Sequence, residues 1–243
     1  MRQINSSISV DCVIFGFDGT SLNVLLIKRE QKNGIEEKED YKLPGSMIYE
    51  DETLSQAAYR VLAQTTGLEN IYLKQLHVFS DPERVRGEDL AWLNRFYQIN
   101  TPRVVTVAYY SLVKLNDRIL TYTMRKKAKW VDVQSIRSLG LDHKEIVMCA
   151  LETLSRELMQ LHIAFELLPR KITIRQLQNL YEAVLGVEID NRNFRKKILS
   201  SGYLIPTNEK EQGVAHKPAQ YYIFNKTQYE REQKSKFRLN FIN

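Results

Sequence analysis

The stretch from Pro44 to Leu68 most constrains how this chain of 243 residues folds. Its apolar residues recur at mixed spacings that suit one face of a helix from about Glu52 to Thr66, and Gly67 is typical of a helix end. These apolar positions are Ala57, Ala58, Val61, Leu62 and Leu68. Residues 61, 64 and 65 are three and four positions apart, so they share one face of the predicted helix.

The same stretch resembles the Nudix box, a catalytic motif with Gly, Glu, an Arg-Glu pair, a Glu-Glu pair and a final Gly at fixed spacings. The residues in register with that motif are Glu52, Arg60, Leu62, Gly67 and Leu68. Ser46 stands at the first Gly position, while Val61, Gln64 and Thr65 stand where the motif has three Glu. The resemblance implies a Nudix fold with an altered box.

The altered positions remove the chemistry of the box. Carboxylates at positions 61, 64 and 65 would form an oxygen-rich site for Mg²⁺ holding a diphosphate. Val, Gln and Thr there supply no anionic oxygen. The acidic residues 50–52 lie at the start of the predicted helix, where acidic side chains commonly cap the helix and are stabilised by its dipole. We therefore expect no catalytic residue, no metal site, no cofactor and no enzyme activity.

Charge is unevenly distributed along the chain. Residues 161–243 contain 14 Lys or Arg and 8 Asp or Glu, whereas residues 1–160 contain 21 of each sign. This asymmetry predicts an anionic partner for the last third, with nucleic acid as the first candidate.

The two cysteines suggest neither a zinc site nor a disulfide framework, and no apolar run suits a signal peptide or a membrane span. We therefore expect a cytoplasmic protein.

The first 160 residues predict one α/β domain. A hairpin is expected from strands 10–17 and 22–28, with a polar surface loop at 30–40 after it. Further strands are expected at 71–79, 104–115 and 128–133, a long irregular stretch at 80–101, and a helix from Asp142-His143 onward. This order resembles the Nudix α/β sandwich over roughly residues 8–160. His77 is interpreted as structural and His143 as part of the helix start.

Residues 161–243 predict a second domain with a winged helix-turn-helix fold. Thr173 is a good N-cap for a helix that ends at Gly186, and Asp190 is a good N-cap for a basic helix over Asn191–Ser200. That helix is expected to bury Phe194, Ile198 and Leu199. Short strands at 203–205 and 220–224 complete the predicted wing. The expected fold class is thus α+β, with a Nudix-like sandwich followed by a winged helix.

The basic helix is the strongest positive signal for function. Arg and Asn form bidentate contacts with base edges in the major groove, and flanking Lys and Arg suit phosphates. The residues predicted to contact DNA are Thr173, Arg175, Gln176, Arg192, Asn193, Arg195, Lys196, Lys197 and Lys217. The alternative is a solvated amphipathic helix on a small domain.

The sequence FELLPRKITIRQLQNLYEAVLGVEIDNRNFRKKI, after an altered Nudix domain, resembles the NrtR-like family of Nudix-related transcriptional regulators. The resemblance covers nearly the whole chain. It implies a homodimer that binds a palindromic operator in double-stranded DNA, usually as a repressor. It also implies that the Nudix-like domain senses a small-molecule effector. Some members respond to ADP-ribose and control NAD metabolism, and others respond to arabinose or xylose.

Two departures favour a pentose sugar or sugar derivative over ADP-ribose. The lost Glu residues weaken the case for a metal-bound diphosphate. Asp81-Pro82-Glu83-Arg84 begins like the DPxRDPRGR-like loop of ADP-ribose-binding members, but the stretch to Arg103 is longer and altered. The residues predicted to contact the effector are Lys28, Arg29, Ser46, Asp81, Arg103 and Tyr109.

Two other functions remain open at this point. The surviving box residues Glu52 and Arg60 suggest a Mg²⁺-dependent Nudix hydrolase of ADP-ribose or a related nucleoside diphosphate. The basic face could instead bind an acidic protein, in which case the chain would be an interaction module.

Overall fold

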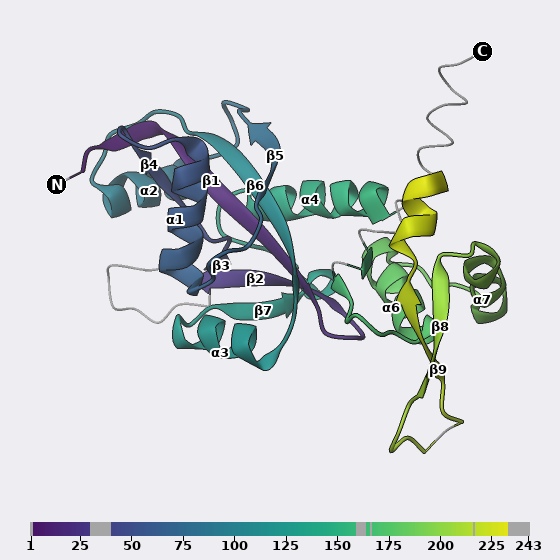
Figure 1. Cartoon of the computed structure of the whole chain (residues 1–243). Coiled ribbons are helices and arrows are strands. Elements are labelled where there is room, and N and C mark those ends of the chain that lie inside the picture. Colours follow the sequence, from purple (N-terminus) through teal and green to yellow (C-terminus); the bar gives the residue numbers. More distant parts are fainter. Residues whose placement is uncertain (1, 30–39, 159–163, 166, 216, 233–243) are drawn as a thin grey trace, which may run out of the picture. The chain divides into compact units, whose positions relative to one another are not determined.

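The computed structural model describes residues 2–29, 40–158, 164–165, 167–215 and 217–232 (Figure 1). The predicted polar loop at 30–40 lies outside the described residues except for Asp40. The chain forms two compact units, one of Met1–Gly16 with Leu22–Thr153 and the other of Phe17–Ser21 with Leu154–Asn243. Among the described residues, no helix is both long enough and apolar enough to cross a membrane.

The first unit is built on a seven-stranded sheet. The order along its main path is β3-β2-β1-β6-β5, while β4 pairs with β1 and β7 pairs with β2. The strands are β1 (Ile4–Phe17), β2 (Leu22–Lys28), β3 (Tyr41–Lys42), β4 (Gly45–Tyr49), β5 (Lys74–Phe79), β6 (Val105–Lys114) and β7 (Lys129–Asp132). The antiparallel pairing of β1 and β4 sets Asp11 opposite Gly45. This register joins the start of the altered box to the middle of the long strand β1.

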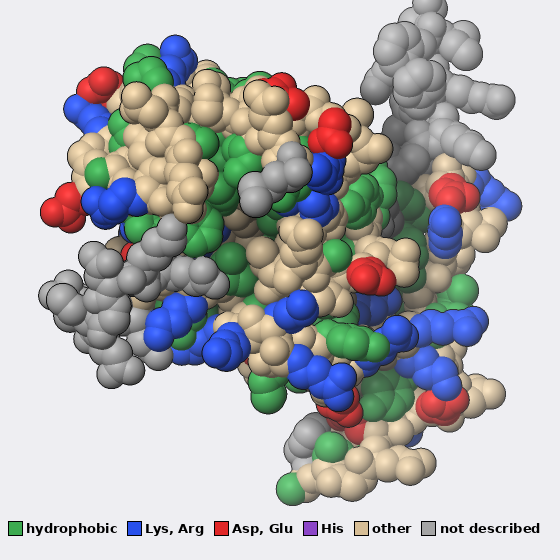
Figure 2. Space-filling model, turned by 90° about the vertical axis from the view of Figure 1, so that its left-hand side faces the viewer, with side chains coloured by type: hydrophobic (Ala, Val, Ile, Leu, Met, Phe, Trp, Pro, Cys, Tyr) green, Lys and Arg blue, Asp and Glu red, His purple; other side chains and the backbone are tan. Residues whose placement is uncertain are grey.

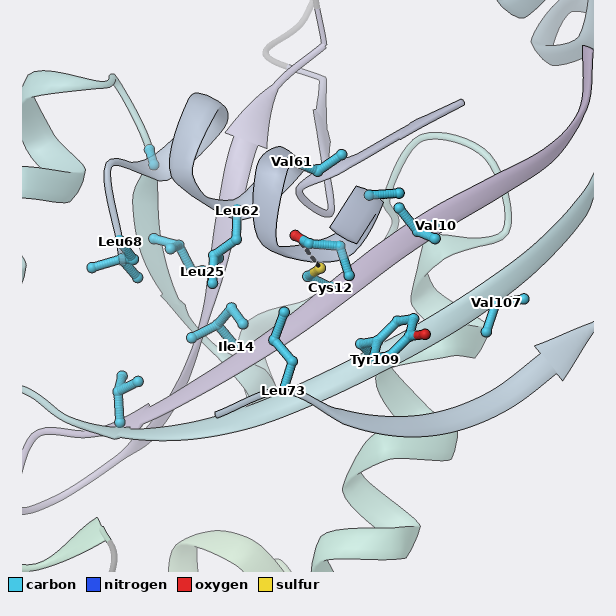
Figure 3. Packing of buried hydrophobic residues seen from close by; sticks show 14 of the residues in the cluster. Val10, Cys12, Ile14, Leu25, Val61, Leu62, Leu68, Leu73, Val107 and Tyr109 are labelled. Carbon is cyan, nitrogen blue, oxygen red and sulfur yellow. Dashed lines mark hydrogen bonds between the residues drawn. The ribbon is translucent and has the colours of Figure 1, made fainter. Parts of the chain in front are cut away.

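The apolar core lies between the sheet and helix α1 (Leu54–Thr66). Thr53 and Gln56 form a capping box at the start of α1, and Gly67 ends the helix in the left-handed conformation. Figure 3 shows Val61 and Leu62 of α1 among the buried side chains of the strands. The thiol of Cys12 donates to the carbonyl of Ala58 in α1.

Both faces of β1 are buried, because side chains alternate along a strand and residues 10–15 are all buried. In Figure 1, α1 lies in front of β1 and helix α4 (His143–Leu158) passes behind β6. The first unit is therefore the predicted α/β sandwich.

Two helices of this unit were not predicted. The stretch 80–101 contains α2 (Gly87–Tyr97), so its prediction as irregular is wrong. Helix α3 (Asp117–Arg125) follows β6. Neither helix ends at a glycine: the residue that caps α2 in the left-handed conformation is Gln98, and the residue that caps α3 is Lys126.

The second unit is a winged helix. Helix α6 (Ile174–Leu185) begins at a Thr173–Gln176 capping box and ends at Gly186, and α7 (Asn191–Ser200) is capped by Asp190. Strands β8 (Leu204–Lys210) and β9 (Gln220–Phe224) form the antiparallel hairpin, and Ile172 bridges to Tyr222. A small apolar cluster joins these elements through Ile174, Leu204 and Tyr222, with Phe165, Phe194 and Ile198 packed against it. The prediction that Leu199 is buried is wrong, because it is 40% exposed.

Candidate functional site

The three altered box positions do not fit a divalent cation. Val61 is 1% exposed within the apolar core. The Gln64 side-chain oxygen accepts a hydrogen bond from Arg60, and the Thr65 hydroxyl donates to the carbonyl of Val61 at 2.7 Å. These groups offer no charged oxygen, whereas Mg²⁺ prefers carboxylate and phosphate oxygens. The donor set at the box therefore gives no support to metal-assisted hydrolysis.

The two surviving box residues form an ion pair. Glu52 accepts hydrogen bonds from Nε and Nη2 of Arg60 at 2.9 and 2.5 Å, and from the backbone N–H of Tyr49 at 2.8 Å. Burial alone would raise the pKa of Glu52, but these bonds hold it below its usual value. The Arg60 guanidinium also lies over the Tyr49 ring. The pair thus ties the end of β4 to α1.

A cavity lies next to β4, whose residues Gly45, Ser46 and Met47 line it. The space inside it that a water molecule can enter is about 30 Å³, and the volume is about 380 Å³ when the space open to solvent is counted. Its walls come from strands β1, β3, β4 and β6, from α2 and the turn before it, and from the residues that lead into α4. The polar residues that line it are Ser9, Asp11, Lys42, Ser46, Arg84, Tyr97, Thr106, Asp142 and His143, and Trp92 contributes an indole ring.

Asp11 and His143 form one wall of this cavity. The backbone N–H of Leu43 donates to Nδ1 of His143 at 2.9 Å, so the ring proton of neutral His143 is on Nε2, which lies 3.5 Å from Oδ1 of Asp11. Burial raises the pKa of Asp11 to about 6, although Lys42 and Arg84 oppose this shift. Burial, together with Lys42 and Arg84, holds the pKa of His143 well below its usual value. Near pH 7 the wall therefore presents a carboxylate beside a neutral imidazole.

Gly45 is required where β4 passes this wall. A Cβ on Gly45 would collide with the carboxylate oxygen of Asp11, its partner in the β1–β4 register. The Lys42 ammonium donates to the carbonyls of Leu43 and Gly45 at 3.1 and 3.0 Å. The glycine next to Ser46 thus lets a buried carboxylate and a buried ammonium share a small space.

A second set of polar side chains in the lining centres on Arg84. Arg84 donates to both carboxylate oxygens of Asp142 at 2.7 and 2.8 Å, and both side chains are 5% exposed. Arg84 also donates to the hydroxyl of Thr106 at 2.7 Å, and that hydroxyl bonds to Ser9. An arginine that donates to both oxygens of one carboxylate is stabilised by the pairing and held in a fixed orientation.

Helix α2 supplies the aromatic part of the cavity. Tyr97 donates its phenol hydrogen to the Ser46 hydroxyl at 3.2 Å, and Trp92 lies on the lining. The Arg29 guanidinium lies over the Trp92 ring, 4.2 Å from its centroid, and pairs with Asp89 at 2.7 Å. The cavity thus combines hydrogen-bonding groups with an aromatic surface, a lining that suits a small, neutral, hydroxyl-rich molecule.

The six residues predicted for the effector lie in different places. Ser46 lines the cavity, and Arg29 contacts the ring of Trp92, which also lines it. Lys28, Asp81 and Arg103 are exposed; Asp81 accepts from the N–H of Glu83, and Arg103 donates to the carbonyl of Ser80. Tyr109 is buried in the apolar cluster beneath α1 (Figure 3).

Sequence reasoning missed most of the cavity. Asp11, Lys42, Arg84 and Asp142 come from segments that are distant along the chain and meet only through strand pairing and loop packing. One available signal was a charged residue inside a buried strand, since Asp11 interrupts the apolar run that begins at Val10. His143 was interpreted only as part of a helix start, and it also lines the cavity.

Helix α7 presents the predicted basic surface of the second unit. Asp190 accepts from the N–H of Asn193 at 2.7 Å and so fixes the start of the helix. The exposed residues of this surface are Arg192, Asn193, Arg195, Lys196 and Lys197. Their pattern leaves Phe194 and Ile198 on the inner face, where they pack against the unit's apolar cluster.

The other four residues predicted for DNA divide into two pairs. Thr173 is 2% exposed, and its hydroxyl accepts a hydrogen bond from the N–H of Gln176. The Gln176 side chain accepts one from the N–H of Thr173, so both residues cap α6. Arg175 is exposed and lies 3.7 Å from Glu182, and Lys217 is exposed between β8 and β9. The exposed cations thus lie on α6, α7 and the wing.

Comparison with known proteins supports this division into two parts. The family model of the NUDIX domain matches residues 6–148. The chain belongs to the Nudix family. The model of the NrtR DNA-binding winged helix domain matches residues 164–224, so the chain has the domain composition of NrtR-like regulators.

Three similar proteins extend this comparison. The ADPR responsive transcriptional repressor NtrR of Acinetobacter baylyi is 27% identical over 227 residues, which cover 91% of this chain and 83% of that protein. The crystal structure of Shewanella oneidensis NrtR complexed with a 27mer DNA is 25% identical, with a TM-score of 0.64 over 92% of this chain and 95% of that one. A MutT/nudix family protein from Enterococcus faecalis, 21% identical with a TM-score of 0.60, covers 90% of this chain and 86% of its own and shares the fold.

Proposed function

We propose that this protein is a DNA-binding transcriptional repressor controlled by a small molecule that binds the Nudix domain. The observation that carries the proposal is the exposed basic helix α7 in a unit that matches the NrtR winged helix domain. The related NrtR structure contains DNA, and the related protein of Acinetobacter baylyi is described as a transcriptional repressor. We further propose that it binds a palindromic operator as a homodimer, since a two-fold protein matches a two-fold DNA site.

The effector that this cavity suits contains a pentose. Hydroxyl groups of a sugar can donate to Asp11, while the His143 ring nitrogen and the Tyr97 hydroxyl offer polar partners beside them. The Trp92 ring offers an apolar surface for the face of the sugar. Two sources of this chemistry are a free pentose and the terminal ribose of ADP-ribose, which the name of the Acinetobacter relative favours.

We propose that the protein does not hydrolyse nucleoside diphosphates. Val61, Gln64 and Thr65 offer no charged ligand for a metal, and Glu52 is engaged by Arg60. A screen of ADP-ribose and related compounds with Mg²⁺ tests this point. Turnover that is lost in Glu52→Gln would overturn it and favour the hydrolase.

The DNA role is tested by a mobility shift with the DNA that flanks this protein's own gene. We expect Arg192→Ala together with Arg195→Ala to abolish specific binding while the protein stays folded. The matched control replaces two exposed cations of the same unit outside α7, Lys226→Ala with Arg231→Ala, and is expected to keep binding. Equal loss in both variants would assign the effect to net charge, and no loss in either would contradict the proposal.

The same assay identifies the effector. ADP-ribose, ribose, arabinose and xylose are added to the wild-type complex in separate titrations. Release by ADP-ribose alone would assign a nucleotide effector, and release by one free pentose would assign a sugar effector. Release by none of them would contradict the proposed ligand chemistry.

A further inference from the structure

A second basic surface lies on the first unit, around α3. The stretch from Lys114 to Lys129 contains six Lys or Arg and one acid, Asp117. The six cations are Lys114, Arg118, Arg125, Lys126, Lys127 and Lys129, and all are exposed. On the face shown in Figure 2, several Lys and Arg side chains are exposed. We call these six residues the α3 patch.

The positive charge is confined to the α3 patch, because the rest of the first unit has no excess of Lys and Arg. Residues 1–160 carry equal numbers of acids and bases, so the part outside the α3 patch is net acidic. Within the described part of the chain, none of the six forms an ion pair with a carboxylate. Arg118 and Lys129 instead lie over the rings of Tyr122 and Tyr41. The α3 patch therefore presents its charges to solvent.

The backbone that carries these cations is fixed. Asn116 accepts from the N–H of Ile119 at the start of α3, and Ile119 packs against the apolar core. Thr123 is 1% exposed, donates to the carbonyl of Ile119 and accepts from the indole of Trp130 at 3.2 Å. Long cationic side chains on a rigid element suit an extended polyanion, because the backbone loses little conformational entropy when they bind.

The side-chain pattern indicates the kind of polyanion. Arg118, Tyr122 and Arg125 are four and three residues apart and share one helix face, so two guanidinium groups flank a phenol. Phosphate oxygens accept from such groups without regard to base sequence. An anionic membrane is the competing partner, because Leu120 and Met124 of α3 are exposed among these cations, although Ile119 packs against the core.

We infer that the α3 patch is a second DNA-binding surface, which contacts the phosphates of duplex DNA independently of sequence. The inference goes beyond the proposed operator recognition by the winged helix. Because both units belong to one chain, duplex held by one unit raises the local concentration of duplex around the other.

The test measures the binding of the full chain to a non-operator duplex by fluorescence anisotropy at several salt concentrations. The patch variant is Arg118→Gln with Arg125→Gln and Lys126→Gln. The control variant makes the same charge change on exposed cations of the same unit, with Arg95→Gln, Arg137→Gln and Lys144→Gln. We expect the patch variant to lose about tenfold in affinity at ~50 mM salt, and its salt dependence to fall by a slope of about 2 to 3.

The outcomes separate this inference from the proposed function. Equal affinities and slopes for the patch and control variants would overturn it and leave the cations as solubilising charge. Binding to vesicles of anionic lipid that the patch variant loses, with unchanged DNA binding, would overturn it in favour of a membrane. Failure of the proposed function appears elsewhere, as operator binding that survives Arg192→Ala with Arg195→Ala.

Discussion

Asp11 is a carboxyl group that is buried and yet lines the cavity. Its raised pKa of about 6 reflects loss of solvation, with the nearby Lys42 and Arg84 lowering it and Asp142 raising it. His143 faces it from the start of α4 and stays neutral, so it does not titrate in the same range. Between pH 5 and 7 the cavity therefore changes from a largely protonated to a largely ionised Asp11.

This change predicts a pH dependence of effector binding. A sugar hydroxyl donates to the carboxylate but less well to the protonated acid, so affinity should rise as the pH increases from 5 to 7. With a pKa of about 6, the ionised fraction rises from about a tenth to about nine tenths, so we expect a gain of up to about tenfold. Isothermal titration calorimetry with the effector identified above measures it.

Two variants make the pH test specific. Asp11→Asn should weaken binding at pH 7 and remove the pH dependence, whereas Asp81→Asn, which changes an exposed carboxylate, should alter neither. An effector affinity that stays constant with pH in the wild type would mean that Asp11 does not accept a hydrogen bond from the ligand.

Val61 allows a separate test of the altered box. Because this side chain is 1% exposed within the apolar core, Val61→Glu buries a carboxylate without a partner. We expect it to lower the free energy of unfolding by about 3 kcal/mol or more. Gln64→Glu, at an exposed position on the same helix, should change it by less than about 0.5 kcal/mol. Urea denaturation measures both, and a stable Val61→Glu protein would show that the helix face turns outward.

The sequence predicted those helices and strands that are marked by an apolar pattern or a cap within a short segment. Strands β2 and β9 and helices α6 and α7 lie where the sequence indicated, because apolar runs and the caps Thr173 and Asp190 are properties of short segments. Helices α2 and α3 were missed since glycine marks neither end: Gln98, which caps α2, and Lys127, which follows the α3 cap Lys126, take the left-handed conformation that glycine usually takes. The cavity was missed because Arg84 and Asp142 meet only in the folded unit.

Helix α6 depends on its capping box. Replacing Thr173 by Ala leaves the N–H of Gln176 without its acceptor, so we expect a loss of about 1 kcal/mol in the free energy of unfolding. Thr173→Ser keeps the oxygen and should lose much less. Thermal unfolding followed by circular dichroism measures both variants. Equal losses in the two variants would assign the effect to the buried methyl group and not to the cap.

The whole molecule joins a Nudix unit to a winged helix unit, and α4 belongs to both, since the unit boundary falls between Thr153 and Leu154. A ligand in the Nudix domain can change DNA affinity only if it binds two arrangements of the protein with different affinities. We propose that the effector favours an arrangement of the dimer in which the two α7 helices no longer match successive major grooves, about 34 Å apart.

This mechanism makes a quantitative prediction about the two ligands. If saturating effector weakens operator binding by some factor, then saturating operator must weaken effector binding by the same factor, because coupling free energy is reciprocal. We expect a factor of about 5 to 150, the range that couplings of 1 to 3 kcal/mol produce. Anisotropy of labelled operator measures the first factor, and calorimetry of effector with and without operator measures the second. Simple competition at a shared surface would instead weaken operator binding without limit as effector is added. A plateau at a finite factor, equal in both directions, is therefore the result that two separate sites on two units require.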